Sequence, residues 1–324
     1  MKGLTAEIKE RALELGFHKI GIARAGRLEE ESRGLDEWLS RGYQGTMAWM
    51  AAARERRTDP REIVPGARSL ISVAINYFSP AEHPAQPSAG KVSRYAWGDD
   101  YHALVESRLN GLLDFIKSRR PDVAARVYVD TGPVMEKAWA QRAGVGWLGK
   151  HTNIITEDYG SWVFLGEIIL DLELEYDLPA VDRCGSCTLC IEACPTQAIV
   201  EPYVVDSNLC ISYLTIEHRG PIPSDLGNKF EGWIYGCDIC QDVCPWNTKF
   251  SKPAGLKEFY PRESNLAPDL KEISALTQEE FSARFRKSPM KRTKRDGLVR
   301  NARIVMEALA GDEQHDRTGD GKSS

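Results

Sequence analysis

Cys184-Gly-Ser-Cys187-Thr-Leu-Cys190-Ile-Glu-Ala-Cys194-Pro195 is the stretch that decides the fold of the middle of this chain. Its spacing, C-x₂-C-x₂-C-x₃-C-P, is that of bacterial ferredoxins with two [4Fe–4S] clusters, in which the fourth cysteine binds the other cluster. A second run, Cys237-Asp-Ile-Cys240-Gln-Asp-Val-Cys244-Pro245, keeps the last three cysteines of this pattern, and the lone Cys210 can replace the missing first one. The eight cysteines of the chain therefore form two sets of four.

Crossed ligation predicts which thiolates share a cluster. One cluster takes Cys184, Cys187, Cys190 and Cys244, and the other takes Cys194, Cys210, Cys237 and Cys240. Structural zinc explains the pattern less well, because it favours two C-x₂-C pairs, often with histidine. Disulfides need an oxidising compartment. The start of the chain, Met1-Lys-Gly-Leu-Thr-Ala, has no apolar signal segment and no twin arginine, so export is not expected.

Composition places the 324 residues among ordinary globular proteins with more than one domain. The hydrophobic share is 42% and the charged share 27%, and no apolar run approaches the roughly 20 residues of a membrane span. We therefore expect a cytoplasmic protein that does not enter the membrane, and we expect it to be a monomer.

The first half of the chain alternates strand and helix patterns. Strands are predicted at 18–23, 69–76, 126–130 and 161–170, and helices at 4–15, 28–39, 99–118 and 134–143. The helix at 99–118 carries an apolar stripe of Val105, Leu109, Leu112 and Ile116. This order favours an α/β domain with a mixed sheet flanked by helices. We divide the chain into an α/β catalytic domain (1–178), a two-[4Fe–4S] ferredoxin-like domain (179–252), a helical basic region (253–310) and a disordered tail (311–324).

The basic residues of the helical region are concentrated. Residues 284–303 hold nine Lys and Arg against the single acid Asp296, a local charge of +8 (nine minus one) in a chain whose net charge is −5. Such a concentration suits a polyanion such as nucleic acid. A solvated helix face would give the same pattern, and the residues alone leave both readings open.

Asp130 is the candidate acid. It ends a predicted strand before Thr131-Gly132-Pro133 and a helix, at the edge where open α/β sheets bind ligands, and a carboxyl group there can exchange a proton. The same residues would also make a good helix N-cap with proline near N1, and the sequence alone favours the cap. The chain has neither a phosphate-binding P-loop nor a strand-anchored G-x-G-x-x-G, which argues against an ATP or dinucleotide site.

Other motifs resemble those of the epoxyqueuosine reductases, in order from about residue 5 to 310. They are Arg54-Glu-Arg-Arg57-Thr-Asp-Pro60 with Pro65-Gly-Ala-Arg68, Ser93-Arg-Tyr95-Ala-Trp97-Gly-Asp-Asp-Tyr101-His102, Val129-Asp130-Thr-Gly-Pro133, Arg142-Ala-Gly-Val-Gly-Trp147-Leu-Gly-Lys150, Cys210-Ile-Ser-Tyr213-Leu-Thr-Ile-Glu217-His-Arg-Gly220 and Ser288-Pro-Met-Lys-Arg292. The resemblance implies a cobalamin-dependent enzyme with two [4Fe–4S] clusters. It would reduce epoxyqueuosine at the wobble position of tRNA to queuosine. The cofactor domain of that family is similar to that of reductive dehalogenases.

The resemblance also implies roles for single residues. Asp130 would be the proton donor, while cob(I)alamin, fed by the clusters and a low-potential electron donor, reduces the epoxide. Cobalamin would be contacted by Arg57, Tyr95, Asp130, Lys150, Asn153, Ser212, Tyr213 and Leu214, and tRNA by Arg219, Lys291, Arg292, Lys294 and Arg295. Asp100-Tyr-His102-Ala-Leu-Val105 lacks the glycine of the Asp-x-His-x-x-Gly cobalt motif, so we expect base-off cobalamin without a protein ligand.

Two alternatives remain. A cobalamin-dependent reductive dehalogenase would share both cofactors but act on a small organohalide, and it would have no need of a basic C-terminal face. A ferredoxin-like electron carrier with a large partner-binding domain would not bind cobalamin.

Overall fold

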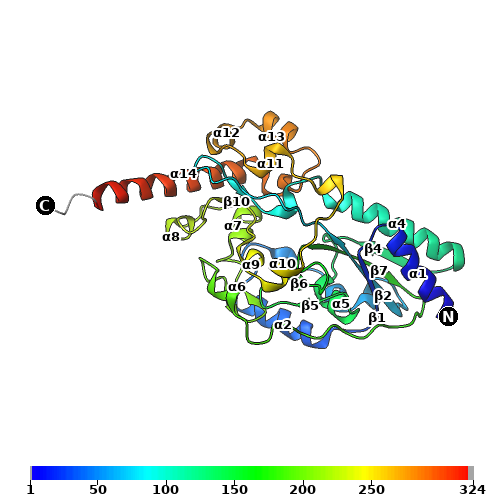
Figure 1. Cartoon of the computed structure of the whole chain (residues 1–324). Helices are drawn as coiled ribbons and strands as arrows, with labels where there is room; N and C mark the ends of the chain where they lie inside the picture. The colour runs from blue at the N-terminus through cyan, green and yellow to red at the C-terminus, as the bar shows by residue number, and fades with distance from the viewer. Residues whose placement is uncertain (1, 320–324) are drawn as a thin grey trace.

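A four-stranded sheet forms the centre of the N-terminal half in the computed structural model, which describes residues 2–319 (Figure 1). Its strand order is β1 (Lys19–Arg24), β2 (Ser69–Asn76), β7 (Val163–Leu170) and β4 (Ala125–Tyr128). The sequence predicted a mixed sheet, but all three neighbouring pairs are antiparallel. Strands β2 and β4 run parallel to each other, as a helical crossover predicts, but β7 lies between them. Pairing over such a sequence distance cannot be read from local patterns.

Helices cover both faces of this sheet. Helices α1 (Lys2–Glu14) and α4 (Tyr101–Arg119) lie together on one face, and α5 (Glu136–Arg142) packs on the other (Figure 1). Strand β2 alternates accordingly: Ile71, Val73 and Ile75 contribute to the core under α1 and α4, while Leu70 and Ala74 contribute to the core under α5. Helix α5 approaches β1 so closely that a Cβ at Gly21 would lie 1.9 Å from the Ala143 carbonyl oxygen. Only glycine fits there.

The cysteine-rich segment folds into short elements at the centre of the molecule (Figure 1). Helices α6 (Leu189–Glu192) and α9 (Ile239–Asp242) pack against each other, each inside one cysteine run. Pro245 stands at the first position of α10 (Pro245–Phe250), directly after Cys244. Proline is favoured at this position because its missing N–H would have no helical partner.

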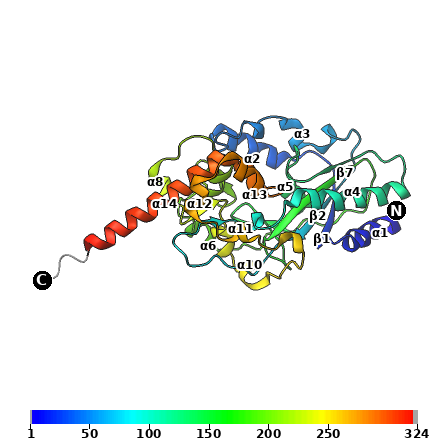
Figure 2. The ribbon, with the colours of Figure 1, turned by 90° about the horizontal axis from the view of Figure 1, so that it is seen from above.

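A third hydrophobic core joins the cysteine-rich segment to the C-terminal helices. Helix α14 (Lys294–Gly319) packs on α12 (Leu270–Ala275), α7 (Ile211–Ile216) and β10 (Trp233–Tyr235). The side-chain amide of Asn301 donates to the carbonyl oxygens of Thr215 and Ile234, at 2.8 Å each. This core therefore crosses the domain boundary that we expected at residue 252. Helix α14 then projects from the molecule, with the two termini at opposite ends (Figure 2).

The remaining elements are short. They are α2 (Glu29–Ser40), η1 (Ala48–Met50), α3 (Arg54–Thr58), η2 (Pro60–Glu62), β3 (Lys91–Val92), η3 (Arg94–Ala96), β5 (Trp147–Leu148), β6 (Ile154–Ile155), β8 (Ile199–Glu201), β9 (Val204–Val205), α8 (Ser224–Gly227), η4 (Lys257–Phe259), α11 (Glu263–Leu266), α13 (Gln278–Arg284) and η5 (Pro289–Thr293). Helix α14 extends to Gly319, so it includes the first part of the tail that we expected to be disordered from residue 311, and residues 320–324 lie outside the described part. Within residues 2–319, no helix combines the length and apolarity needed to cross a bilayer.

Candidate functional site

A cavity of about 1330 Å³ lies between the α/β part, the cysteine-rich segment and η5. Pockets for drug-sized ligands usually measure roughly 300–1,000 Å³. This cavity is larger, so it has room for a large cofactor or for more than one molecule. Its walls come from segments that are far apart in the sequence, among them residues 47–57, 93–102, 130–137, 151–154, 194–217 and 288–294.

Four of the cysteines line this cavity and four do not. Cys194, Cys210, Cys237 and Cys240 are part of its wall. Burial raises the pKa of the Cys240 thiol, followed by the charge of Cys210, with smaller contributions from Cys190 and Cys194. In the other set, burial and then the charges of Cys244, Cys184 and Cys187 raise the pKa of Cys190 to about 11. The four cysteines on the cavity wall are the ones that crossed ligation assigns to one cluster, although Cys190 of the other group also lies near Cys240. The assignment of thiolates to clusters stays a prediction. Iron binding would offset the raised pKa values, because a bound metal favours the thiolate.

Asp130 points its carboxyl group into the cavity from the loop after β4. Its backbone is left-handed, with φ of 55°, and its N–H donates to Oε1 of Glu136 at 2.5 Å. The N-cap interpretation is wrong, because α5 begins only at Glu136, with Met135 in the cap position and no side-chain cap. A non-glycine residue in this region costs of order 1–3 kcal/mol and is typical of functional loops.

His102 connects Asp130 to a second carboxylate. It stands in the first turn of α4, where Nδ1 lies 2.6 Å from Oδ1 of Asp100 and Nε2 lies 3.4 Å from Oδ2 of Asp130. Burial acts to lower the pKa of His102, but the hydrogen bonds and charges of both carboxylates raise it to about 9. Burial likewise acts to raise the pKa of Asp130, yet the hydrogen bond and charge of His102, the charge of Lys137 and a hydrogen bond from Tyr101 lower it. The proton shared by this pair therefore resides on His102 at neutral pH.

Sequence reasoning missed His102 as part of the site. It quoted Asp100 and His102 within a family motif and in the argument against a cobalt ligand, but it gave His102 no role. The available signal was the pattern Asp-x-His at the start of a predicted helix. A protonated histidine is unfavourable near the positive end of the helix dipole, so a histidine there that stays charged needs acidic partners.

Two carboxyl groups, the buried Glu167 and the half-buried Glu136, lie beside the Asp130 loop. Glu167 on β7 is fully buried, pairs with Ser72 across the sheet, and accepts a hydrogen bond from Ser72 Oγ at 3.4 Å. Burial and then the charge of Glu136 raise the pKa of Glu167, while burial and then the charge of Asp130 raise the pKa of Glu136 to about 7. Burial and the neighbouring carboxyl groups therefore favour the protonated form of Glu167 in the fold.

We expect Glu167→Gln to stabilise the protein at pH 8.5 and to have little effect at pH 5. The pKa of Glu167 is higher in the fold than in the unfolded chain, where it is about 4.5, so folding takes up protons above that pH and stability falls as pH rises. Glutamine has nearly the same shape and does not ionise. A rise in the unfolding temperature of about 2–4 °C, the shift that 1 kcal/mol gives in a domain of 150–250 residues, would appear only at high pH. Glu106→Gln, on the exposed side of α4, is the control. An equal shift at both pH values would contradict this account.

Two buried donors in the cavity wall lack partners. Arg57 on α3 is only 8% exposed, and its Nε has no hydrogen-bond partner among the described residues. His151 is 4% exposed; its Nδ1 accepts from the Asn153 N–H at 3.1 Å, which leaves the proton on an unpartnered Nε2. Buried donors without partners cost free energy, so the wall is prepared for a ligand with hydrogen-bond acceptors.

Most of the other residues that resemblance implied for the cofactor lie on the same wall. Tyr95 lines the cavity, and its hydroxyl donates to Tyr235 at 3.1 Å. Asn153 also lines it, accepting from Lys137 Nζ at 3.1 Å, and Ser212 and Tyr213 contribute from α7. Lys137 is a cavity residue that the sequence analysis did not name.

Lys150 and Leu214 are placed elsewhere. The Lys150 ammonium donates to the carbonyl oxygens of Gly185 (2.7 Å) and Cys187 (2.9 Å), so it holds the loop of the first cysteine run. Leu214 is buried in the C-terminal core, 3% exposed, and its carbonyl accepts from Arg300. Neither side chain forms part of the cavity wall that the structure describes.

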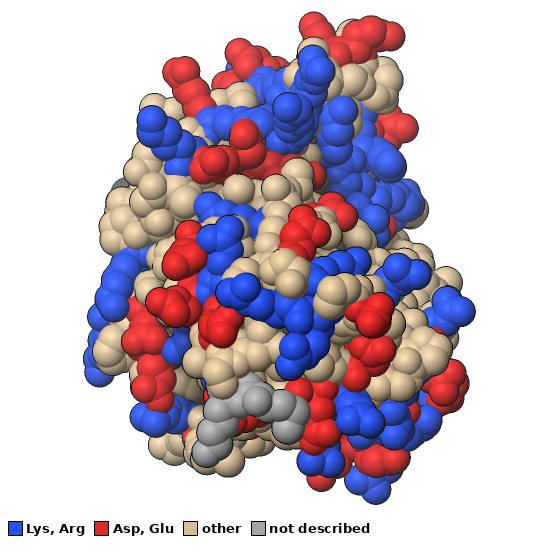
Figure 3. All heavy atoms as spheres, turned by 90° about the vertical axis from the view of Figure 1, so that its right-hand side faces the viewer, with Lys and Arg blue, Asp and Glu red and all other residues tan. Residues whose placement is uncertain are grey.

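The basic residues of 284–303 serve two purposes. The guanidinium groups of Arg295 and Arg300 donate hydrogen bonds to backbone carbonyl oxygens of neighbouring segments. Arg219, which follows α7, does the same. Lys291, Arg292 and Lys294 are instead exposed at the cavity, and Arg292 also pairs with Glu217 at 2.7 Å. Part of the basic run therefore stabilises the fold, and binding of a polyanion by the exposed residues at the cavity stays a prediction. On the face with α1 and α4, acidic and basic side chains are interspersed (Figure 3).

Comparison with known proteins gives consistent matches. A family model described as epoxyqueuosine reductase QueG, DUF1730, matches residues 57–131, and one described as a 4Fe-4S double cluster binding domain matches residues 183–247. An epoxyqueuosine reductase of Synechocystis sp. is 48% identical over 291 residues, which cover 89% of this chain and 100% of that protein.

Two solved structures extend the match to the fold. One is epoxyqueuosine reductase with a tRNA-Tyr epoxyqueuosine-modified stem loop, 33% identical with a TM-score of 0.89. The other, from Bacillus subtilis, has its catalytic aspartate loop swung out of the active site and is 32% identical with a TM-score of 0.88. Each covers 95% of this chain and 82% of the other. The predicted architecture, an α/β domain followed by a two-cluster ferredoxin-like segment and C-terminal helices, is confirmed, and the chain belongs to the epoxyqueuosine reductase family.

Proposed function

We propose that this protein reduces epoxyqueuosine in tRNA to queuosine. The observation that carries the proposal is that one cavity brings together Asp130, one set of four cysteines and exposed basic residues. A relative of the same family binds a stem loop of epoxyqueuosine-modified tRNA, and another has a catalytic aspartate loop. The reaction removes the epoxide oxygen as water, which takes two electrons and two protons, and it leaves an alkene.

We infer the direction of electron transfer from the positions of the two sets of cysteines. We assign Cys194, Cys210, Cys237 and Cys240 to the cluster beside the cavity and Cys184, Cys187, Cys190 and Cys244 to the outer cluster. Such clusters pass single electrons, here from a low-potential donor at the surface toward the cavity. The crossed arrangement keeps the two sets next to each other through α6 and α9.

The wall of the cavity fits cobalamin. Arg57 Nε and His151 Nε2 are buried donors without partners, and the amide and phosphate oxygens of this cofactor are acceptors. The volume of about 1330 Å³ accommodates a large ligand, with Tyr95, Asn153, Ser212 and Tyr213 also on the wall. When bound, cobalamin would supply a strongly reducing cobalt centre for the epoxide. His102 is engaged by Asp100 and Asp130, in keeping with cobalt that takes no protein ligand.

The protein's own groups then bind and protonate the substrate. Lys291, Arg292 and Lys294 at the cavity would contact tRNA phosphates, which position the strand without reading its sequence. The modified base must leave its stack to enter, at a cost of a few kcal/mol that is lowest in a loop. Asp130 would protonate the epoxide oxygen. We place this reaction in the cytoplasm.

The direct test is nucleoside mass spectrometry of epoxyqueuosine-containing tRNA after anaerobic incubation with protein that holds both clusters, with and without cobalamin, and a strong reductant. The proposal expects loss of one oxygen from the modified base, and only when cobalamin is present. Conversion without cobalamin would remove the cofactor from the proposal, and no conversion by the fully loaded protein would contradict the function.

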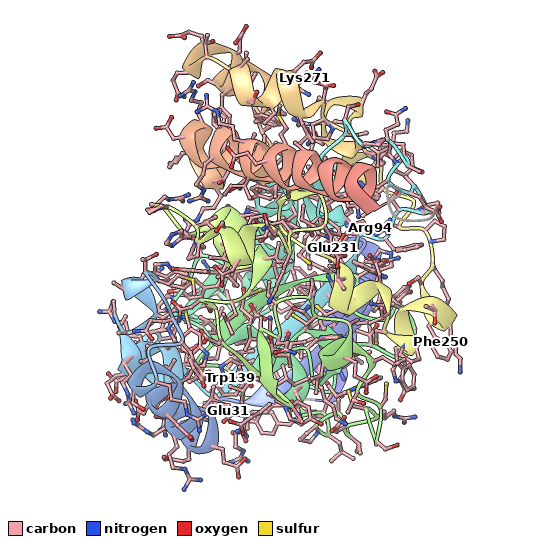
Figure 4. All side chains as sticks on the ribbon, turned by 90° about the vertical axis from the view of Figure 1, so that its left-hand side faces the viewer. Glu31, Arg94, Trp139, Glu231, Phe250 and Lys271 are labelled. Carbon is pink, nitrogen blue, oxygen red and sulfur yellow. The ribbon has the colours of Figure 1, made fainter. Side chains whose placement is uncertain are left out.

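We expect Lys291→Ala with Lys294→Ala to weaken tRNA binding and its salt dependence. Each lost phosphate contact reduces the slope of log K against log salt by about 0.7–0.9, so the double variant should lose about 1.4–1.8. Lys271→Ala is the control, because Lys271 on α12 is not among the described residues that line the cavity (Figure 4). Filter binding of the tRNA at roughly 50 to 300 mM salt, a range around physiological ionic strength, gives both the affinity and its salt dependence. An unchanged slope would place the tRNA elsewhere.

A further inference from the structure

Asp100, His102 and Asp130 form a chain of three groups at the cavity wall. The imidazole lies between two carboxylates, at 2.6 Å from Asp100 Oδ1 and 3.4 Å from Asp130 Oδ2, and all three residues line the cavity. The Tyr101 ring stacks on His102, with centroids 4.2 Å apart, and also on Phe164 at 4.0 Å. This packing limits the rotation of the imidazole, and Asp100 is itself fixed as the N-cap of α4.

The reaction makes a demand that a single carboxyl group cannot meet alone. Both protons end on the same oxygen, which leaves as water, while the two electrons come from the low-potential donor. Asp130 can deliver one proton each time it is protonated, and its pKa is lowered, so it is a carboxylate for most of the time at neutral pH. Once the substrate fills the cavity, the second proton has to come from a group already in contact with Asp130.

We propose that His102 holds and resupplies the protons that Asp130 passes to the departing oxygen, with Asp100 orienting the imidazole. The inference rests on the proposed function. His102 acts through Asp130 and is in this sense a positioning residue.

The steps balance as follows. Asp130 begins as a carboxylate and takes a proton from Nε2 of His102, and the first carbon–oxygen bond breaks as Asp130 gives this proton to the epoxide oxygen. His102 regains a proton from solvent and passes it to Asp130 in turn, while the two electrons from the low-potential donor end in the carbon–carbon double bond. The second bond breaks as this second proton reaches the hydroxyl group, and water leaves. His102 then regains a proton from solvent. Other charged and titratable groups face the Asp100, His102 and Asp130 side chains. They are Tyr101 on α4, Glu136 and Lys137 on α5, Tyr95 on η3 and Arg292 on η5.

The test compares wild type, His102→Gln, Asp100→Asn and the control His18→Gln. His18 is a half-buried histidine of the α/β part whose Nδ1 accepts from the Asn76 N–H at 3.3 Å, remote from the cavity wall. Single-turnover conversion of epoxyqueuosine tRNA is measured across a pH range of roughly 6 to 10, which spans the ordinary histidine pKa and the raised one. Iron content and tRNA affinity are measured for each variant.

His102→Gln is expected to slow conversion about 100-fold at neutral pH, within the range of general acid catalysis, with iron content and tRNA affinity unchanged. The wild-type rate should fall only above a pH of about 9, where His102 loses its proton. In His102→Gln the fall should begin at much lower pH, because only Asp130 is left to titrate. Asp100→Asn should move the wild-type limb to lower pH, and His18→Gln should match wild type.

A second variant keeps the inference testable if glutamine disturbs the fold. His102→Ala opens space for added imidazole, which should restore a measurable part of the rate; no restoration in a variant with both clusters would overturn the proposal. A His102→Gln enzyme with the wild-type rate and pH profile would also overturn it.

Histidine NMR provides a readout that does not depend on turnover. The chain has only six histidines, so each resonance can be assigned by substitution. The His102 resonance should titrate near pH 9 and move to lower pH in Asp130→Asn. Should wild type convert no tRNA, the proposed function fails, and this titration alone decides: an ordinary pKa for His102 would then refute the proton chain as well.

Discussion

Replacing Cys240 by serine is expected to remove one of two clusters and to abolish turnover. Cys240 lines the cavity with three other cysteines, and its loss leaves the adjoining cluster without a full set of thiolates. Iron per chain should fall from about eight atoms to about four, since each [4Fe–4S] cluster holds four. Iron analysis and single-turnover conversion of epoxyqueuosine tRNA measure both effects.

Cys187→Ser is the matched control, because Cys187 belongs to the outer set. It should also leave about four iron atoms per chain. A small reductant that enters the cavity can supply electrons without the outer cluster, so Cys187→Ser should retain single turnover with titanium(III) citrate, and Cys240→Ser should not. Equal activity of the two variants under this reductant would contradict the order of the clusters.

Asp130→Asn is expected to slow conversion by about 10²–10⁴-fold, the usual contribution of general acid–base catalysis. Asparagine keeps the size of the side chain and suits the left-handed backbone at this position, but it cannot deliver a carboxyl proton. The loss should appear in the single-turnover rate, while the dissociation constant for tRNA changes less than about threefold, because this residue acts on the bond that breaks and not on the phosphates.

Asp122→Asn controls for the loss of a carboxylate near the same strand. Asp122 is exposed and precedes β4, whereas Asp130 follows it. The control should keep the wild-type rate. An Asp130→Asn enzyme within tenfold of wild type would show that another group is the acid, and Lys137 would be the next candidate, because it also faces the cavity.

The parts of the structure that the sequence predicts well depend on local spacing. The cysteine runs predict iron–sulfur clusters, because iron ligation requires short, fixed intervals between the cysteines. Strand β2 was predicted at its observed bounds, since a run of buried apolar residues ends at polar or proline-containing turns. Helix α4 likewise follows its apolar stripe.

What the sequence did not predict depends on contacts between distant residues. The position of β7 between β2 and β4 sets the strand directions, and no local pattern encodes it. His102 and Asp130 are 28 positions apart and meet only when α4 and the β4 loop face the same cavity. Resemblance identified motifs correctly but not the direction of every side chain: Lys150 holds the cluster loop, and Arg219 bonds to backbone carbonyls.

The dispersed walls of the cavity have a consequence for the order of synthesis. All eight cysteines precede residue 245, whereas η5, which completes the cavity, begins at Pro289. During translation the thiols leave the ribosome before the last wall exists, and N-terminal parts generally fold first. Iron delivery can therefore begin on a nascent chain, while a ligand enclosed by the whole cavity has to wait for release of the C-terminal segment. Cys210 and Cys237 pack against the core that α14 completes, so the cluster beside the cavity would also depend on the C-terminal segment.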